Sequence, residues 1–177
     1  TAKGYEYMIR AMPEILQHFP DAVYFIQGKP HPTGWKVKEY YESLQEEVVQ
    51  LNLSHAVLFA EDFVSRSDLI RLLQSIHVYV NPYVDHTQSV SGTLAMALSA
   101  GAACVSTPYP YAAETLRRNN TGIIVPFRDS EALSSVIVDL LGNPGRLEGF
   151  SVRAHALAST MSWRRVAEAY LELATVR

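Results

Sequence analysis

The stretch Gln88-Ser-Val-Ser-Gly-Thr-Leu-Ala-Met-Ala-Leu-Ser-Ala-Gly101 predicts a tight entry into a helix, followed by a glycine stop. Apolar runs at residues 77–82 and 103–106 flank it and are typical of strands. A helix that begins in a loop after a strand directs its first N–H groups into a crevice, where they have no intrahelical partners. Such groups suit a phosphate or another anion. We therefore predict an anion site at Ser91, Gly92, Thr93 and Leu94.

The alternation of strand and helix continues along the chain. Short apolar runs are typical of five strands, at residues 22–27, 56–60, 77–82, 103–106 and 123–125. Segments with apolar residues at helical spacing separate them. This pattern predicts a single α/β domain with a mostly parallel sheet. The continuously apolar run 22–27 further predicts a strand buried on both faces, and Trp163 is expected to pin the last helix to the sheet.

Ligands of such sheets bind beyond the carboxyl ends of the strands. The expected walls of a site are therefore the loops at residues 28–33, 61–65, 83–91 and 107–112. Asp85 and His86 suggest a metal at first sight, but no further ligand follows at suitable spacing. A solvated loop is the preferred interpretation there.

Composition excludes several classes of protein. The 177 residues carry a net charge of −3 and no run of Lys or Arg, which argues against nucleic acid as a partner. No apolar stretch is long enough for a membrane span, and no signal-peptide pattern opens the chain. The single cysteine, Cys104, lies in an apolar run and is expected to be a small buried residue rather than a catalytic thiol. These features favour a reducing compartment, the cytoplasm.

The order of several motifs resembles a known family. The motifs are Lys3-Gly4, Val57-Leu-Phe59, Val78-Tyr-Val-Asn-Pro82, Ser91-Gly-Thr-Leu94 and Thr121-Gly-Ile-Ile-Val-Pro126. Their order resembles the donor-binding C-terminal domain of retaining glycosyltransferases with the GT-B fold, the glycosyl transferases group 1 family. The resemblance implies that residues 1–177 form one Rossmann-like three-layer sandwich, one half of a GT-B fold.

The resemblance also implies a function and site residues. A nucleotide-sugar donor would place its diphosphate at residues 91–94 and beside Gln88, with Lys3 neutralising charge, and its sugar would pass to an unidentified acceptor. No cofactor and no metal is implied, and no catalytic residue is assigned. His31, Phe63 and Glu114 are possible donor contacts. For each an ordinary alternative stays open: an incidental loop histidine, a packed phenylalanine, and a surface glutamate; Lys3 could equally be a solvated lysine.

The chain departs from the family pattern in three places. The two family glutamates spaced E-x7-E correspond to Gln88 and Met96, and a methionine cannot accept the hydrogen bonds of a ribose. Pro110-Tyr111 replaces the glycine pair that follows the next strand. Two alternatives therefore stay open, a non-catalytic binding or scaffold domain that has kept the fold, and a nucleotide-sugar epimerase-like enzyme.

The resemblance further implies missing parts. The family domain begins with a strand before Lys3-Gly4, and an N-terminal domain precedes that strand. In the strand order 3-2-1-4-5-6 the missing strand would be central. We therefore expect two unpaired strand edges, beside residues 22–27 and 77–82, and an N-terminal GT-B domain as the partner of this chain.

Overall fold

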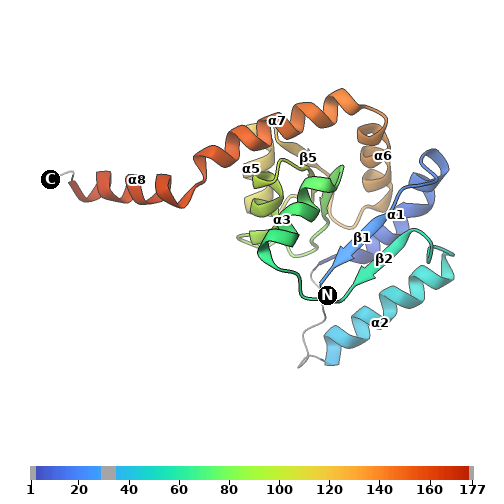
Figure 1. The fold of residues 1–177 in the computed structure, drawn as a ribbon. Coiled ribbons are helices and arrows are strands. Elements are labelled where there is room, and N and C mark those ends of the chain that lie inside the picture. The colour runs from blue at the N-terminus through green and yellow to red at the C-terminus, as the bar shows by residue number, and fades with distance from the viewer. Residues whose placement is uncertain (1–2, 29–34, 176–177) are drawn as a thin grey trace.

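The structure, a computed structural model, describes residues 3–28 and 35–175. Helices and strands alternate along the described chain (Figure 1). The strands are β1 (Tyr24–Gln27), β2 (Val57–Ala60), β3 (Val78–Asn81), β4 (Ala103–Ser106) and β5 (Gly122–Ile124). The helices are α1 (Tyr5–His18), α2 (Trp35–Gln50), α3 (Arg66–Ser75), α4 (Gly92–Ser99), α5 (Pro110–Asn119), α6 (Ser130–Leu141), α7 (Pro144–Thr160) and α8 (Trp163–Thr175). The predicted α/β alternation is confirmed.

All described strand pairs are parallel, but they form two separate sheets. β1 pairs with β2, and β3, β4 and β5 pair in that order. No described strand joins β1 to β3. The expected unpaired edges therefore exist within the described chain, one on β1 and one on β3.

Two apolar cores flank the strands, as in a three-layer sandwich. One core unites α1, α2 and α6 with β1 and β2, and the other unites α3, α4, α5 and α7. β4 contributes to both, because side chains of a strand alternate between its faces. Ala103 and Val105 enter the first core and Cys104 enters the second.

Cys104 is fully buried, as predicted. Burial raises the pKa of its thiol well above the ordinary value, because a thiolate loses its hydration in an apolar core. At neutral pH the residue is therefore a neutral packing group.

Two predictions about packing are wrong. β1 is not buried on both faces: Phe25 is 38% exposed and the preceding Val23 is 54% exposed. No strand covers the inner edge of β1, so these side chains lack neighbours on that side. Trp163 is 85% exposed, since α8 has no buried residue and extends away from the rest of the chain (Figure 1).

None of the helices in the described part of the chain is both long and apolar enough to cross a bilayer.

Candidate anion site at the carboxyl ends of the strands

The start of α4 has the geometry that the sequence predicts. Ser91 is the N-cap, with an extended backbone, and its Oγ accepts a hydrogen bond of 3.2 Å from the Leu94 N–H. The Ala95 N–H donates to the Ser91 carbonyl oxygen. Both bonds are typical of a helix that begins directly after a small polar residue. The cap fixes the direction in which the remaining N–H groups of this turn point.

Two N–H groups of this turn stay available to a ligand. Gly92 and Thr93 occupy the first two helical positions, where no intrahelical acceptor exists. Neither N–H has a partner among the described residues, and both residues are exposed. The Leu94 N–H, in contrast, is used by the cap, and the Leu94 side chain is fully buried. An anion at this turn would therefore meet Gly92 and Thr93 first.

Lys3 lies beside the same turn. Its Nζ donates a hydrogen bond of 2.7 Å to the Tyr83 hydroxyl and sits 4.2 Å from the centre of the Tyr83 ring. Tyr83, which follows β3, also neighbours the side chains of Ser91 and Thr93. The tyrosine therefore brings an ammonium group from the start of the chain to the positive end of α4.

A buried polar cluster supports the site from below. The Asn81 Nδ2 donates to the Tyr109 hydroxyl at 2.8 Å and to the Ser91 Oγ at 3.3 Å. The rings of Tyr109 and Tyr83 stack with their centres 5.3 Å apart. Thr107 Oγ1 donates to the Tyr83 carbonyl oxygen at 2.6 Å. These bonds join the ends of β3 and β4 to the cap of α4, so Tyr83 is held from several sides.

One buried atom of this cluster has no partner. The Asn81 Oδ1 accepts no hydrogen bond from the described residues, although Asn81 is only 1% exposed. An unsatisfied buried acceptor costs free energy. Asn81 lines the same cavity as Lys3, Tyr83 and Thr93. Its amide is therefore a polar group available in the wall of the candidate site.

The surroundings of Tyr83 change its acidity. Burial opposes ionisation, but the ammonium of Lys3 and the hydroxyls of Ser91 and Thr93 outweigh burial and lower the pKa of the phenol below 10. The pKa is then lower in the folded protein than in the unfolded chain. Ionised Tyr83 therefore stabilises the fold above about pH 10, and this contribution is lost as the pH falls through the lowered pKa.

We expect the tyrosinate absorbance of the folded protein to start rising at a lower pH than that of Tyr83→Phe, because the variant lacks the early step that comes from the lowered pKa of Tyr83. Lys3→Met should move the step to higher pH, because the ammonium that favours the phenolate is gone. Tyr41→Phe is the matched control. Burial and then Glu61 raise the pKa of Tyr41 to about 12, so that variant should lose only a late step. An early step that persists in Tyr83→Phe contradicts the assignment.

The structure places the other predicted site residues at several positions. Gln88 lies in the loop before α4, where its Nε2 donates to the Val90 carbonyl oxygen at 2.6 Å. Glu114, on α5, is exposed and pairs with Arg118 at 3.6 Å. Phe63 is fully exposed in the loop after β2, so the alternative of core packing is wrong. His31 lies outside the described residues. Of the predicted residues, Lys3, Ser91 and Thr93 are brought together around Tyr83.

Sequence reasoning missed Asn81, Tyr83 and Tyr109. A signal was present, because each lies at or just after the carboxyl end of a predicted strand, and loops 83–91 and 107–112 were expected walls of the site. Asn81 is a polar residue at the carboxyl end of an apolar run. Aromatic residues there could equally have been core residues, so only the fold shows that both hydroxyls bond to polar groups at the site.

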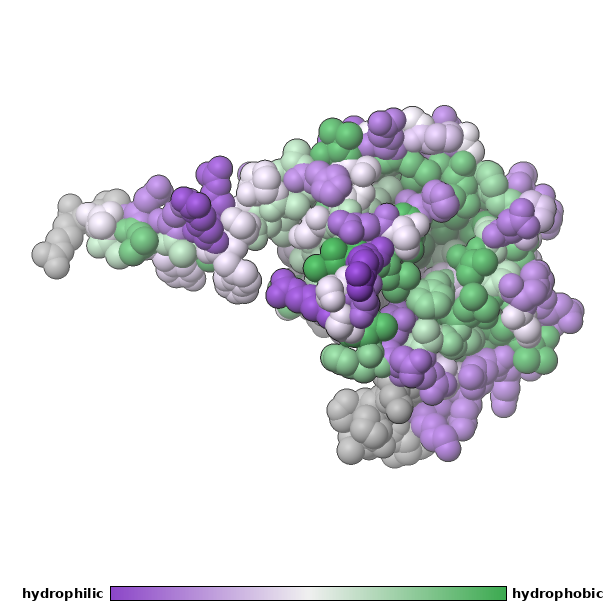
Figure 2. Space-filling model, viewed as in Figure 1, coloured by the Kyte–Doolittle hydropathy of each residue, from purple (hydrophilic) through white to green (hydrophobic). Residues whose placement is uncertain are grey.

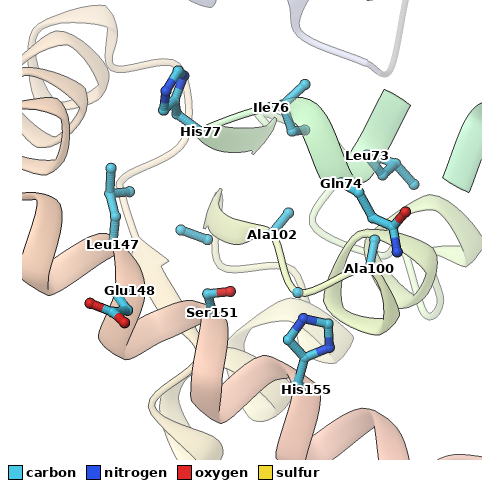
Figure 3. A pocket seen from close by; sticks show the side chains of 12 residues that line it. Leu73, Gln74, Ile76, His77, Ala100, Ala102, Leu147, Glu148, Ser151 and His155 are labelled. Atoms are coloured by element: carbon cyan, nitrogen blue, oxygen red, sulfur yellow. The ribbon is translucent and has the colours of Figure 1, made fainter. Parts of the chain in front are cut away.

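A second cavity lies at the opposite ends of the strands. It has a volume of about 430 Å³ and is lined by residues of α3, α7 and the starts of β3 and β4. Figure 3 shows Glu148 directed away from His155, while His77 lies on another wall. No group of three or more potential metal ligands occurs among residues 3–28 and 35–175. This cavity therefore offers less converging chemistry than the turn at Gly92.

The chain belongs to the glycosyl transferases group 1 family, whose model matches residues 1–143. This match confirms the family expected from the order of the motifs. No curated protein sequence matches the chain significantly.

Solved structures confirm the fold. The chain is similar to Anabaena Alr3699/HepE in complex with UDP and glucose, with a TM-score of 0.82 at 17% identity, over 99% of this chain and 45% of that one. For WaaG, a glycosyltransferase involved in lipopolysaccharide biosynthesis, the TM-score is 0.74 at 20% identity, over 99% of this chain and 44% of WaaG. The C-terminal domain of a group 1 glycosyl transferase (LpcC) from Francisella tularensis has a TM-score of 0.77 at 16% identity, and the match covers 90% of this chain and 80% of that domain's chain. The chain thus spans less than half of WaaG and HepE and most of an isolated C-terminal domain.

Proposed function

We propose that this chain is the half of a retaining glycosyltransferase that binds the nucleotide-sugar donor. The observation that carries the proposal is the pair of N–H groups at Gly92 and Thr93, which have no acceptor among residues 3–28 and 35–175 and lie near Lys3, in a member of this family. The similar HepE structures contain UDP and UDP-glucose, which supports a nucleotide sugar as the ligand. An N-terminal domain of the full protein would supply the acceptor site and the groups that are not assigned here.

The chemistry of the proposed site follows from its charges. When the bond between the sugar and the diphosphate breaks, negative charge develops on the leaving diphosphate. Oriented N–H groups stabilise such charge with little reorganisation, and the positive end of α4 adds to their effect. The Lys3 ammonium, which Tyr83 holds nearby, supplies a full positive charge. In this proposal these groups neutralise the diphosphate, so that neither a cofactor nor a divalent cation is required.

A substitution of Gly92 by proline tests the role of the main chain. Proline lacks the N–H but suits the first position of a helix. The extended backbone of Ser91 is compatible with a following proline, and a Cβ at Gly92 meets no atom within 4 Å. We expect Gly92→Pro to weaken UDP binding about 10- to 100-fold, as the loss of a hydrogen bond to a charged group does, in calorimetric titrations of the chain.

Gly92→Ala is the matched control, because it adds a side chain and keeps the N–H. It should bind UDP within about twofold of the unsubstituted chain, the small effect typical of an uncrowded surface position. Equal weakening in both variants would point to the side chain and not to the N–H group. Absence of any binding of UDP or UDP-glucose to the unsubstituted chain would remove the proposed function.

Experiments on the full protein distinguish the proposed transferase from two other functions. A scaffold domain binds no sugar nucleotide. An epimerase-like enzyme converts a nucleotide sugar without any acceptor, whereas a transferase forms a glycoside only when an acceptor is present. Incubation of the full protein with a nucleotide sugar alone, followed by product analysis, discriminates between these chemistries, and the anomeric configuration of a glycoside product tests retention.

A further inference from the structure

The hydroxyl group of Tyr83 has a hydrogen that no described residue accepts. The Lys3 Nζ donates to this hydroxyl at 2.7 Å, and an ammonium group is a donor only. The phenol oxygen is therefore the acceptor in this bond, and its own hydrogen needs a different partner. Within residues 3–28 and 35–175 the Tyr83 hydroxyl makes no second hydrogen bond.

The hydroxyls of Ser91 and Thr93, which neighbour Tyr83, do not take up this hydrogen. The Ser91 Oγ already accepts from the Asn81 Nδ2 and from the Leu94 N–H, and a hydroxyl oxygen has two acceptor lone pairs. The hydrogen of Ser91 itself faces the Thr93 Oγ1, 3.2 Å away. The hydrogen of Tyr83 thus stays available beside the positive end of α4.

The position of this hydroxyl is well defined. Tyr83 is only 7% exposed, and its ring stacks on that of Tyr109. It lines the same cavity as Lys3 and Thr93, and Figure 2 shows hydrophobic side chains around the hollow of this cavity beside α3. Hydrogen bonds are stronger in such surroundings than in water, and a missing bond costs more free energy. A ligand oxygen that accepts this hydrogen would therefore be bound firmly.

Titratable groups face the Tyr83 hydroxyl from four segments of the chain. They are Lys3, Tyr5 on α1, Tyr79 on β3 and Tyr109 at the start of α5. Burial raises the pKa of each of these three other phenols, because a phenolate loses hydration inside the protein. They stay neutral where Tyr83 starts to ionise. In the described chain no carboxylate oxygen lies within 4.0 Å of the Lys3 Nζ.

We propose that Tyr83 binds the anion directly, with its hydroxyl donating to an oxygen of the diphosphate that lies at the Gly92 and Thr93 N–H groups. This inference rests on the proposed function of that site. Lys3 then lies between the phenol and the anion and neutralises charge. The neutral phenol is the binding form, because a phenolate has no hydrogen to donate and repels the diphosphate.

The first test removes the hydroxyl and keeps the ring. We expect Tyr83→Phe to weaken UDP binding about 10- to 100-fold in calorimetric titrations near neutral pH, as the loss of a hydrogen bond to a charged group does. Tyr170→Phe is the control, because it removes a hydroxyl from α8 at a residue that is 71% exposed. It should bind UDP within about twofold of the unsubstituted protein. Unchanged UDP affinity in Tyr83→Phe would overturn the proposal.

A double-mutant cycle separates direct contact from an effect through Lys3. Tyr83→Phe is compared in the unsubstituted protein and in Lys3→Met, which has no ammonium for the phenol to hold. Direct contact predicts that Tyr83→Phe weakens UDP binding at least about fivefold in both. If it adds nothing in Lys3→Met, Tyr83 acts only by positioning Lys3 and the proposal is wrong.

A second readout uses the ionisation of Tyr83 in the unsubstituted protein. Tyrosinate absorbance is titrated with and without saturating inorganic pyrophosphate, which does not absorb there. Binding and ionisation are linked, so an anion that prefers the neutral phenol tenfold moves the early step upward by about one pH unit. We expect at least this shift, and its absence in Tyr83→Phe. An early step that stays in place, or moves to lower pH, contradicts direct contact.

Failure of this inference can be distinguished from failure of the proposed function. If the unsubstituted protein and Tyr83→Phe bind UDP equally well, the proposed function stands and the role of Tyr83 is rejected. If the protein binds pyrophosphate but not UDP, the proposed function is rejected, and the same variants are compared with pyrophosphate. Binding of neither compound rejects both.

Discussion

Replacing Gly4 by alanine is expected to destabilise the protein by about 2–5 kcal/mol. The left-handed backbone at Gly4 costs an alanine about 1–2 kcal/mol, and forcing a methyl group into a packed site costs about 1–3 kcal/mol more. A Cβ there would lie 2.0 Å from the Pro82 carbonyl oxygen, a backbone atom that cannot move aside easily. Denaturant unfolding measures the change. Since Gly4 follows Lys3, the variant should also lose the early ionisation step of Tyr83.

Gly145→Ala is the control for this prediction. Gly145 lies in the first turn of α7, and a Cβ there meets no atom within 4 Å. Alanine favours helix over glycine by up to about 1 kcal/mol, so stability should stay equal or rise. A stability of Gly4→Ala equal to that of Gly145→Ala would show that the contact between Gly4 and Pro82 is absent in solution.

Replacing Tyr109 by alanine is expected to cost about 3–5 kcal/mol, in the range for removing a buried aromatic ring. Tyr109 is fully buried, stacks on Tyr83 and accepts a hydrogen bond from Asn81. Its loss leaves a cavity below Tyr83 and removes a partner from the Asn81 amide. The expected result is a lower midpoint of denaturant unfolding together with weaker UDP binding, because the wall that positions Tyr83 and Ser91 is no longer held.

Tyr109→Phe separates the ring from the hydroxyl. This variant keeps the packing and should cost only about 1–3 kcal/mol, the penalty of a buried donor that loses its acceptor. Tyr170→Ala removes a ring of the same kind from an exposed position on α8, where Tyr170 is 71% exposed, and should leave stability within about 0.5 kcal/mol. Equal losses for Tyr109→Ala and Tyr109→Phe would contradict the packing role and favour the hydroxyl alone.

Local pattern was enough to predict most of the elements. Each of the five apolar runs overlaps a strand, and Ser91 caps α4 as its position before the helix suggests. Such features depend on neighbours within a few residues, and those neighbours are visible in the sequence. The prediction for β1 was wrong for a physical reason: an apolar run indicates that its side chains avoid water, but it does not show whether a strand is present on each side to cover them.

Part of the candidate site could also be predicted from local sequence. The turn at Gly92 and Thr93 could be found because a helix start is a local feature. Tyr83 and Tyr109 could not be assigned from the chain alone, since a tyrosine after a strand is as compatible with core packing as with a binding site. Their roles depend on contacts with Lys3 and Asn81, which lie 80 and 28 positions away in the sequence.

The order of apolar runs, caps and glycines by itself determined that this chain forms an α/β domain, and the order of its motifs pointed to the glycosyl transferases group 1 family. It also located the helix start at Gly92, which we propose as an anion site. Only the tertiary structure decided that Lys3 meets Tyr83 beside that helix, that Trp163 stays in solvent, and that β1 and β3 lie in separate sheets. The reason is that hydrogen bonds and burial between distant segments depend on how the strands assemble, while a helix start is specified by the few residues that form it.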